Sequence, residues 1–264
     1  MTAATALLFA MLLASCTADA SKSDADSWGV RRMGQQLESL SEVNTGKPTR
    51  IGTIDARVVA TRQRKGLAIE LRADAATAAL LAASDETYTP ELDKALDWLQ
   101  RLQPRAQPAR IVLTLIDDTH RTRLRRVHDT RAATVVDLVV AMPADAASPS
   151  VEVGRALAVA LHEMSHALSA GIAAGRRPSR RDDEYRAAMV EACYRVDTLR
   201  AGDTLRLAPR KGAGAGEDFV AAASRDAGRD VVADLVRAAG TTTVHWYDEV
   251  ALRGLKLACA VKVA

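Results

Sequence analysis

Two short runs of almost uninterrupted apolar residues constrain the fold of this chain more than any other feature. They are IVLTLI at residues 111–116 and TVVDLVV at residues 134–140, and both are rich in β-branched side chains. Runs of this kind are typical of strands in the middle of a sheet, where both faces are covered. An arginine-rich stretch separates them. We expect it to be a connecting strand or loop with solvated side chains, namely His120, Arg121, Arg123, Arg125, Arg126 and His128.

A hairpin and a helix are predicted before these strands. Residues 58–60 and 67–71 alternate around a polar turn, which is the pattern of a β-hairpin. Thr89 is a suitable N-cap, Pro90 suits the first helical position, and Glu91 suits the first turn. An amphipathic helix is therefore expected to begin at Thr89.

The second half of the chain has mainly helical patterns. Helices are expected over residues 151–170, 181–199 and, after a glycine-rich break, near 217–239. The fold class is therefore α+β with a mainly helical C-terminal part. No clear boundary interrupts residues 49–264, so we expect one domain there.

The charge balance argues against nucleic acid as a partner. Among 264 residues, 36 are Lys or Arg and 33 are Asp or Glu, which gives a formal net charge of +3. The chain has no polybasic block with interleaved aromatic residues, the usual footprint of nucleic-acid binding.

The N-terminal segment has the features of an export signal. Residues 1–15 carry no charged side chain, and their apolar run is too short to span a bilayer. The run ends in Leu-Ala-Ser-Cys16, which resembles the lipobox of bacterial lipoproteins. This resemblance implies cleavage before Cys16, acylation of its thiol, and a membrane-anchored protein of the bacterial cell envelope. Residues 16–48 would then form a tether and a short helix. An ordinary signal peptide with a chance cysteine is the alternative.

Two further cysteines remain if Cys16 is acylated. They are Cys193 and Cys259, and an even remainder in an exported chain suggests one disulfide. Two buried free thiols are the alternative.

The sequence His162-Glu163-Met-Ser-His166 matches the pattern H-E-x-x-H inside the helix predicted over 151–170. Residues four apart on a helix project from nearly the same face, so both imidazoles can bind one Zn²⁺. Glu163 lies one step around the helix, where its carboxylate can accept a proton from a zinc-activated water. An apolar stripe on the same helix is expected to dock it on the core and to leave the histidines facing a cleft.

A third protein ligand is needed if water is to occupy the fourth position. The extended metzincin pattern is excluded, because Ser169 and Ile172 stand where it needs Gly and His. The following helix offers Glu184, in a charged cluster, and Glu191, in apolar surroundings. An ionised carboxylate on an apolar face needs a partner, so we favour Glu191 as the ligand. Glu184, or an Asp elsewhere, is the alternative.

His162 to His166 followed by a carboxylate on the next helix resembles the gluzincin group of zinc metallopeptidases, over residues 151–199. The resemblance implies a zincin-like twisted sheet packed on an active-site helix. It further implies that the edge strand of this sheet binds an extended peptide or protein substrate, and that Glu163 acts as general base. Gluzincins often add a His or Tyr that stabilises the oxyanion, a role open to His245 or Tyr247, although a structural aromatic cluster is the alternative. A non-catalytic metal-binding lipoprotein that acts as a binding or assembly factor is the rival function.

Overall fold

The computed structural model describes residues 55–84, 88–102, 108–117, 123–129, 133–142, 148–172, 179–208 and 230–263. All of them belong to one compact unit, Ile51–Ala264. The expected signal peptide over residues 1–15, the tether over 16–48, and both Cys16 and His120 lie outside the described residues.

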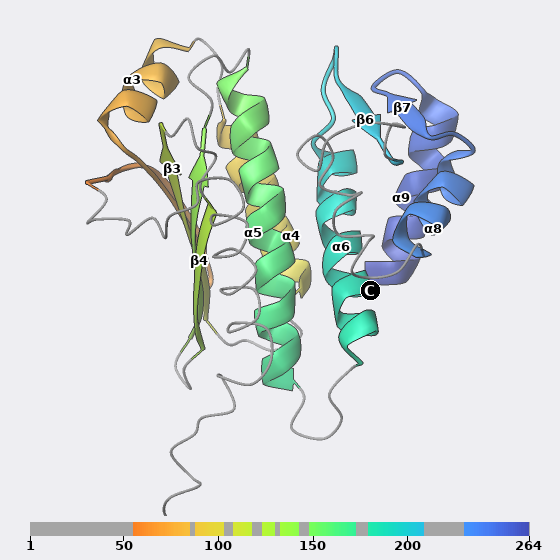
Figure 1. Ribbon diagram of the computed structural model, residues 1–264, viewed down its shortest axis with the longest axis horizontal. Helices are drawn as coiled ribbons and strands as arrows, with labels where there is room; N and C mark the ends of the chain where they lie inside the picture. Colours follow the sequence, from red (N-terminus) through yellow and green to blue (C-terminus); the bar gives the residue numbers. More distant parts are fainter. Residues whose placement is uncertain are drawn as a thin grey trace, which may run out of the picture. The chain divides into compact units, whose positions relative to one another are not determined.

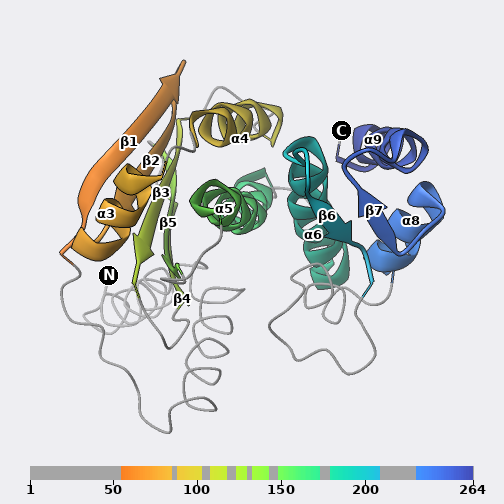
Figure 2. The ribbon, with the colours of Figure 1, turned by 90° about the horizontal axis from the view of Figure 1, so that it is seen from above.

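A five-stranded mixed sheet, seen from its edge in Figure 1, has the strand order β1-β2-β3-β5-β4, which can be followed in Figure 2. The central strands β2, β3 and β5 run parallel, whereas β1 and β4 are antiparallel to their neighbours. The strands are β1 (Arg57–Arg64), β2 (Leu67–Ala73), β3 (Ala109–Ile116), β4 (Arg123–Asp129) and β5 (Thr134–Ala141). The two apolar runs thus form β3 and β5, which pair with each other as the sequence predicts for central strands.

Burial explains why β3 has an uninterrupted apolar sequence. Side chains on both of its faces are buried, including Ile111, Val112 and Leu113. In β2, by contrast, buried and half-buried residues alternate. The predicted hairpin of β1 and β2 is present, and its turn places Lys65 and Gly66 at positive φ. The left-handed conformation suits the glycine, and it matches the twist of the flanking strands.

Six helices lie within the part of the chain that the structure describes. They are α3 (Ala75–Ala83), α4 (Thr89–Leu102), α5 (Pro149–Ile172), α6 (Arg180–Asp197), α8 (Asp230–Ala239) and α9 (Glu249–Val263). The helix expected near 217–239 is described only as α8, because residues 217–229 lie outside the described ranges. The sequence did not predict α3, α9 or a small hairpin of β6 (Thr204–Arg206) and β7 (Thr243–His245).

The helices stack in successive layers beside the sheet (Figure 2). Helices α4 and α5 pack on the sheet, α6 packs on α5 on the side away from the sheet, and α8 and α9 pack on α6. Helices α8 and α9 approach each other closely at Gly254, where an added Cβ would lie 1.9 Å from the carbonyl oxygen of Ala238. None of the described helices is long and apolar enough to cross a bilayer.

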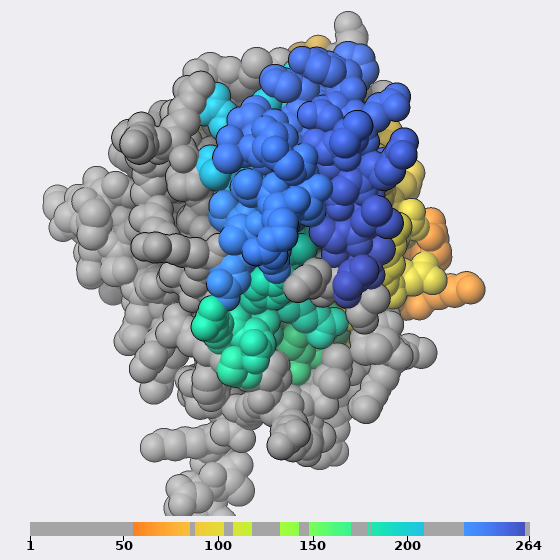
Figure 3. Space-filling model, turned by 90° about the vertical axis from the view of Figure 1, so that its right-hand side faces the viewer, coloured from red at the N-terminus to blue at the C-terminus, as the bar shows by residue number. Residues whose placement is uncertain are grey.

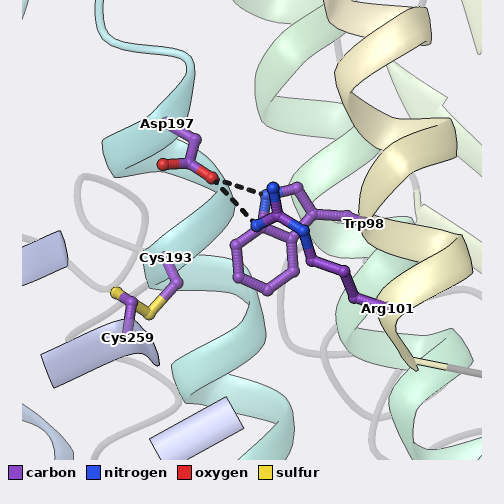
Figure 4. Close-up of a disulfide and its surroundings, with 5 residues drawn as sticks. All are labelled: Trp98, Arg101, Cys193, Asp197 and Cys259. Carbon is purple, nitrogen blue, oxygen red and sulfur yellow. Dashed lines mark hydrogen bonds and ion pairs between the residues drawn. A yellow bond between two sulfur atoms is a disulfide. The ribbon is translucent and has the colours of Figure 1, made fainter. Parts of the chain in front are cut away.

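Helix α6 is attached to its neighbours on two sides (Figure 4). A disulfide joins Cys193 of α6 to Cys259 of α9, with their Cα atoms 5.6 Å apart. On the other side, the Trp98 indole of α4 donates a hydrogen bond of 2.9 Å to the Asp197 carboxylate. The guanidinium of Arg101 lies 3.5 Å from the same carboxylate. These links fix the helix that carries the candidate acidic ligands.

A buried ion pair connects the ends of three helices. Glu91 of α4 is buried and pairs with Arg200, which follows α6. Arg200 also donates to the Ser150 hydroxyl of α5 over 2.8 Å, and the Tyr194 hydroxyl donates to the Glu91 carbonyl oxygen over 3.0 Å. Breaking a buried pair of this kind leaves an uncompensated charge, so the network fixes how α4, α5 and α6 meet.

The half-buried face of the sheet carries a second ionic cluster. Glu70 of β2 accepts a hydrogen bond of 2.6 Å from Arg72 and pairs with Arg110 of β3. Burial raises the pKa of Glu70, but the two arginines lower it by more, so its pKa lies below the ordinary value.

Candidate metal centre

Helix α5 lies between the sheet and α6, and this position determines the environment of the H-E-x-x-H residues. The expected apolar stripe is buried, because Leu157, Leu161, Met164 and Leu168 all lie in the core. The histidines face α6 rather than an open cleft, and only 4% of His162 is exposed. The site is therefore more enclosed than the sequence predicted.

Two imidazoles and one carboxylate converge on a single point between α5 and α6. The Nε2 atoms of His162 and His166 lie 3.1 Å apart. The Oε2 atom of Glu184 lies 3.9 Å from the first nitrogen and 3.5 Å from the second. These three atoms form the one group of possible metal-ligating atoms found among the described residues.

The spacing of these atoms fits a small tetrahedral ion. Ligand atoms that each lie about 2.0–2.1 Å from a tetrahedral Zn²⁺ are about 3.3–3.4 Å from one another. The three observed separations, 3.1, 3.5 and 3.9 Å, scatter around that value. Two imidazole nitrogens with one carboxylate oxygen are also a donor set that zinc accepts.

A carboxylate also lies near the second ring nitrogen, Nδ1, of each histidine. Glu191 Oε2 lies 3.3 Å from His162 Nδ1, and Asp183 Oδ2 lies 2.7 Å from His166 Nδ1. Carboxylates in this position hold a metal-ligating imidazole with its proton on Nδ1 and its Nε2 lone pair free for the metal. The Asp183 carboxylate is hydrogen-bonded to His166 in this way, whereas Glu191 lies near His162 Nδ1 without a hydrogen bond to it.

The local charge is strongly acidic. Four carboxylates, those of Glu163, Asp183, Glu184 and Glu191, lie around two histidines. Only 2% of the Glu191 side chain and 15% of the Glu184 side chain are exposed. Burial lowers the pKa of His166, but its carboxylate neighbours raise it by more, to about 9. A buried excess of carboxylates is costly without a cation, and a divalent ion would supply one.

The sequence favours Glu191 as the third ligand and keeps Glu184 as the alternative, and the two carboxylates lie at different nitrogens of His162. Glu184 lies at the ligand position, whereas Glu191 contacts the far side of the His162 ring. The seven-position separation of Glu184 and Glu191 corresponds to about 10 Å along α6, so the two carboxylates reach opposite sides of one imidazole. Glu191 is buried as its apolar surroundings predict, and the ionisable atom 3.3 Å from its Oε2 is His162 Nδ1.

Other residues singled out by the sequence are not part of this group. His245 lies 3.2 Å from the Thr204 hydroxyl and stacks on Tyr247 with ring centroids 5.2 Å apart. No described contact links either aromatic residue to the two ligand histidines, so the arrangement is that of an aromatic cluster. For Arg123, Arg125, Arg126 and His128 the structure describes the strand β4 but not the side chains, and Arg121 lies outside the described residues.

Sequence reasoning missed the role of Asp183. Asp183 lies in the charged cluster at the start of α6, next to Glu184. The signal was its position directly before a candidate ligand, because adjacent residues at a helix start can face one partner helix together.

A comparison of the chain with protein-family models, with curated proteins and with solved structures finds no match.

Proposed function

We propose that this protein is a zinc-dependent peptidase with a zincin-like fold. The observation that carries the proposal is the convergence of His162 Nε2, His166 Nε2 and Glu184 Oε2 from two adjacent helices. The sheet supports it, because the edge strand β4 is antiparallel to β5 and both contact the helix that bears the histidines. An edge strand offers unpaired backbone groups to an extended peptide, as the resemblance to gluzincins implies.

His162, His166 and Glu184 would hold the ion, and Glu191 and Asp183 would orient the two imidazoles. When bound by these residues, zinc would supply Lewis-acid chemistry, namely polarisation of a carbonyl and a lowered pKa of water. Glu163 is 7% exposed and directly follows the first ligand histidine. Its carboxylate takes the proton of the attacking water and then gives it to the leaving amine. The enclosure of the site excludes bulk water from these charges.

The predicted acylation of Cys16 remains part of the proposal. It would place the peptidase on a membrane of the bacterial envelope, acting on a peptide or protein substrate there. Replacing Cys16 by Ala is expected to release the protein from membranes. Continued membrane association of that variant, together with no fatty acid on the native protein, would contradict the anchor.

Zinc content and peptide cleavage, measured on the same preparations, test the centre. His162→Ala, His166→Ala and Glu184→Ala should each lose zinc and activity, because three ligands are few enough that each one matters. Glu163→Gln should keep zinc and lose cleavage, since an amide cannot take the proton. Glu152→Gln, in the first turn of the same helix and paired with Arg155, is the matched control and should change neither quantity.

Two results would refute parts of this proposal. A Glu184→Ala protein with full zinc content would remove Glu184 from the ligand set. A Glu163→Gln protein that cleaves at the native rate would exclude the general-base mechanism. The enclosure of the site favours one second candidate, a non-catalytic metal-binding lipoprotein. That candidate predicts stoichiometric zinc, no cleavage by the native protein, and a loss of stability when zinc is removed.

A further inference from the structure

Helix α9 is apolar on two opposite sides. Its inner side carries Ala251, Leu255 and Cys259, which are buried against the neighbouring helices. Its outer side carries Val250, Leu257 and Val261, which are 81%, 64% and 76% exposed. A helix that is apolar all round is normally covered on every side. Figure 3 shows α9, in dark blue, beside α8 on the outer face of the molecule.

The exposed side chains form one line. Residues separated by seven and eleven positions lie within about 20° of one another around a helix, and eleven positions span about 16 Å. Trp246 and Tyr247 directly precede α9 and are 45% and 63% exposed. Their rings meet edge to face at 5.6 Å. We call these five residues, Trp246, Tyr247, Val250, Leu257 and Val261, the outer stripe.

Cationic side chains border the outer stripe. Arg253 and Lys256 are exposed and line an open hollow of about 460 Å³ together with Glu249, Leu252 and Leu257. With two cations and one carboxylate, the hollow carries a net positive charge. Aliphatic residues beside Trp and Tyr, bordered by Arg and Lys, are the composition of helices that lie in a membrane interface.

We propose that the outer stripe rests on an anionic phospholipid surface, with lipid phosphates beside Arg253 and Lys256. A second copy of the chain fits less well, because a stable protein interface uses about 20–30 residues on each side and the stripe has five. The acylation predicted at Cys16 would hold the chain at such a surface, where even weak docking becomes effective. Docking through α9 would also orient the metal centre, because α9 packs on α6. The proposal does not depend on bound metal or on catalysis.

Quenching of Trp246 by brominated phospholipids tests this contact. The full chain has three tryptophans. A Trp28→Phe background leaves Trp246 and the buried Trp98 as emitters. Vesicles of phosphatidylethanolamine with about one third phosphatidylglycerol present the anionic surface. Any attachment through the N-terminal apolar segment is common to all variants, so differences in Trp246 quenching report the stripe itself.

Native protein should show quenching of Trp246, and the variant Val250→Asp/Leu257→Asp/Val261→Asp should lose it. Val58→Asp is the matched control, because Val58 is 54% exposed on β1, and it should behave as native. A second variant, Arg253→Glu/Lys256→Glu, leaves the apolar residues in place. It should lower affinity for anionic vesicles at least about tenfold, and added salt should no longer weaken binding, because salt then screens a repulsion.

Four outcomes would overturn the proposal. They are absence of quenching in the native protein, unchanged quenching in the triple variant, an equal loss in Val58→Asp, and no effect of the charge reversal. A native dimer that the triple variant dissociates, without lipid contact in either protein, would assign the stripe to a second copy instead.

Discussion

Removal of the disulfide between Cys193 and Cys259 is expected to destabilise the protein through its unfolded state. The bridge joins residues separated by 66 positions. In the chain-entropy model, a closed loop of that length lowers the entropy of the unfolded chain enough to stabilise the fold by about 4 kcal/mol. Because domains of this kind are stable by about 5–15 kcal/mol, the loss is a large share of the total.

Urea unfolding of four proteins measures this contribution. The set is the native chain, Cys193→Ala, Cys259→Ala and the double variant, each in a chelating buffer so that metal binding does not contribute. Either single substitution removes the whole bridge, so both single variants and the double variant should lose the same free energy of unfolding, within about 1 kcal/mol. The urea m-value should rise in all three, because the unfolded chain is no longer cross-linked.

Two results would refute this reasoning. Additive losses, with the double variant losing twice as much as either single variant, would show that the cysteines act as separate core side chains. A loss below about 1 kcal/mol in all three variants would show that the bridge hardly constrains the unfolded chain.

Further predictions concern packing, metal affinity and pH. Gly254→Ala should lower the free energy of unfolding by about 1–3 kcal/mol or more, measured by urea titration, because its Cβ would meet the Ala238 carbonyl. Asp183→Asn should weaken zinc binding about 10–100-fold in a competition titration, since the amide holds the His166 ring less well. Because the pKa of Glu70 is lower in the folded state than in the unfolded state, its stabilising effect is complete above the unfolded pKa. That effect disappears as pH falls through the folded pKa, so Glu70→Gln should be destabilising at pH 7 and nearly neutral in strong acid, as judged by the urea midpoint.

The local sequence pattern was sufficient to predict those helices and strands whose buried residues recur at a regular spacing. The sequence predicted β3 and β5 because both faces of these strands are apolar, and it predicted α5 and α6 because their apolar positions recur at helical spacing. It did not predict α9. The outward Val250 and Leu257 interrupt the alternation of apolar and polar faces by which an amphipathic helix is recognised. Helix α3 is short and mostly alanine, so it has little periodicity to detect.

The sequence predicted which residue types make up the candidate site, but it did not predict how their side chains are arranged around the histidines. The two imidazoles are four positions apart on one helix, so local helix geometry alone places His162 beside His166. The third ligand depends on the axial position at which α6 packs against α5, and this position is set by tertiary structure. The apolar surroundings of Glu191 in the sequence predict its burial, yet they do not predict which nitrogen of His162 lies near its carboxylate.

The position of the centre on two consecutive helices has a consequence for the order of folding. The two histidines and the carboxylates of Asp183, Glu184 and Glu191 all lie on α5 or α6, which are consecutive helices among the described residues, so these groups are close in sequence. The β2–β3 pairing and the disulfide both require distant segments to meet. Contacts close in sequence form with little loss of chain entropy, and a metal ion that binds them stabilises the helix pair directly. Availability of the ion would then affect how fast the chain folds, and not only how stable or active the folded protein is.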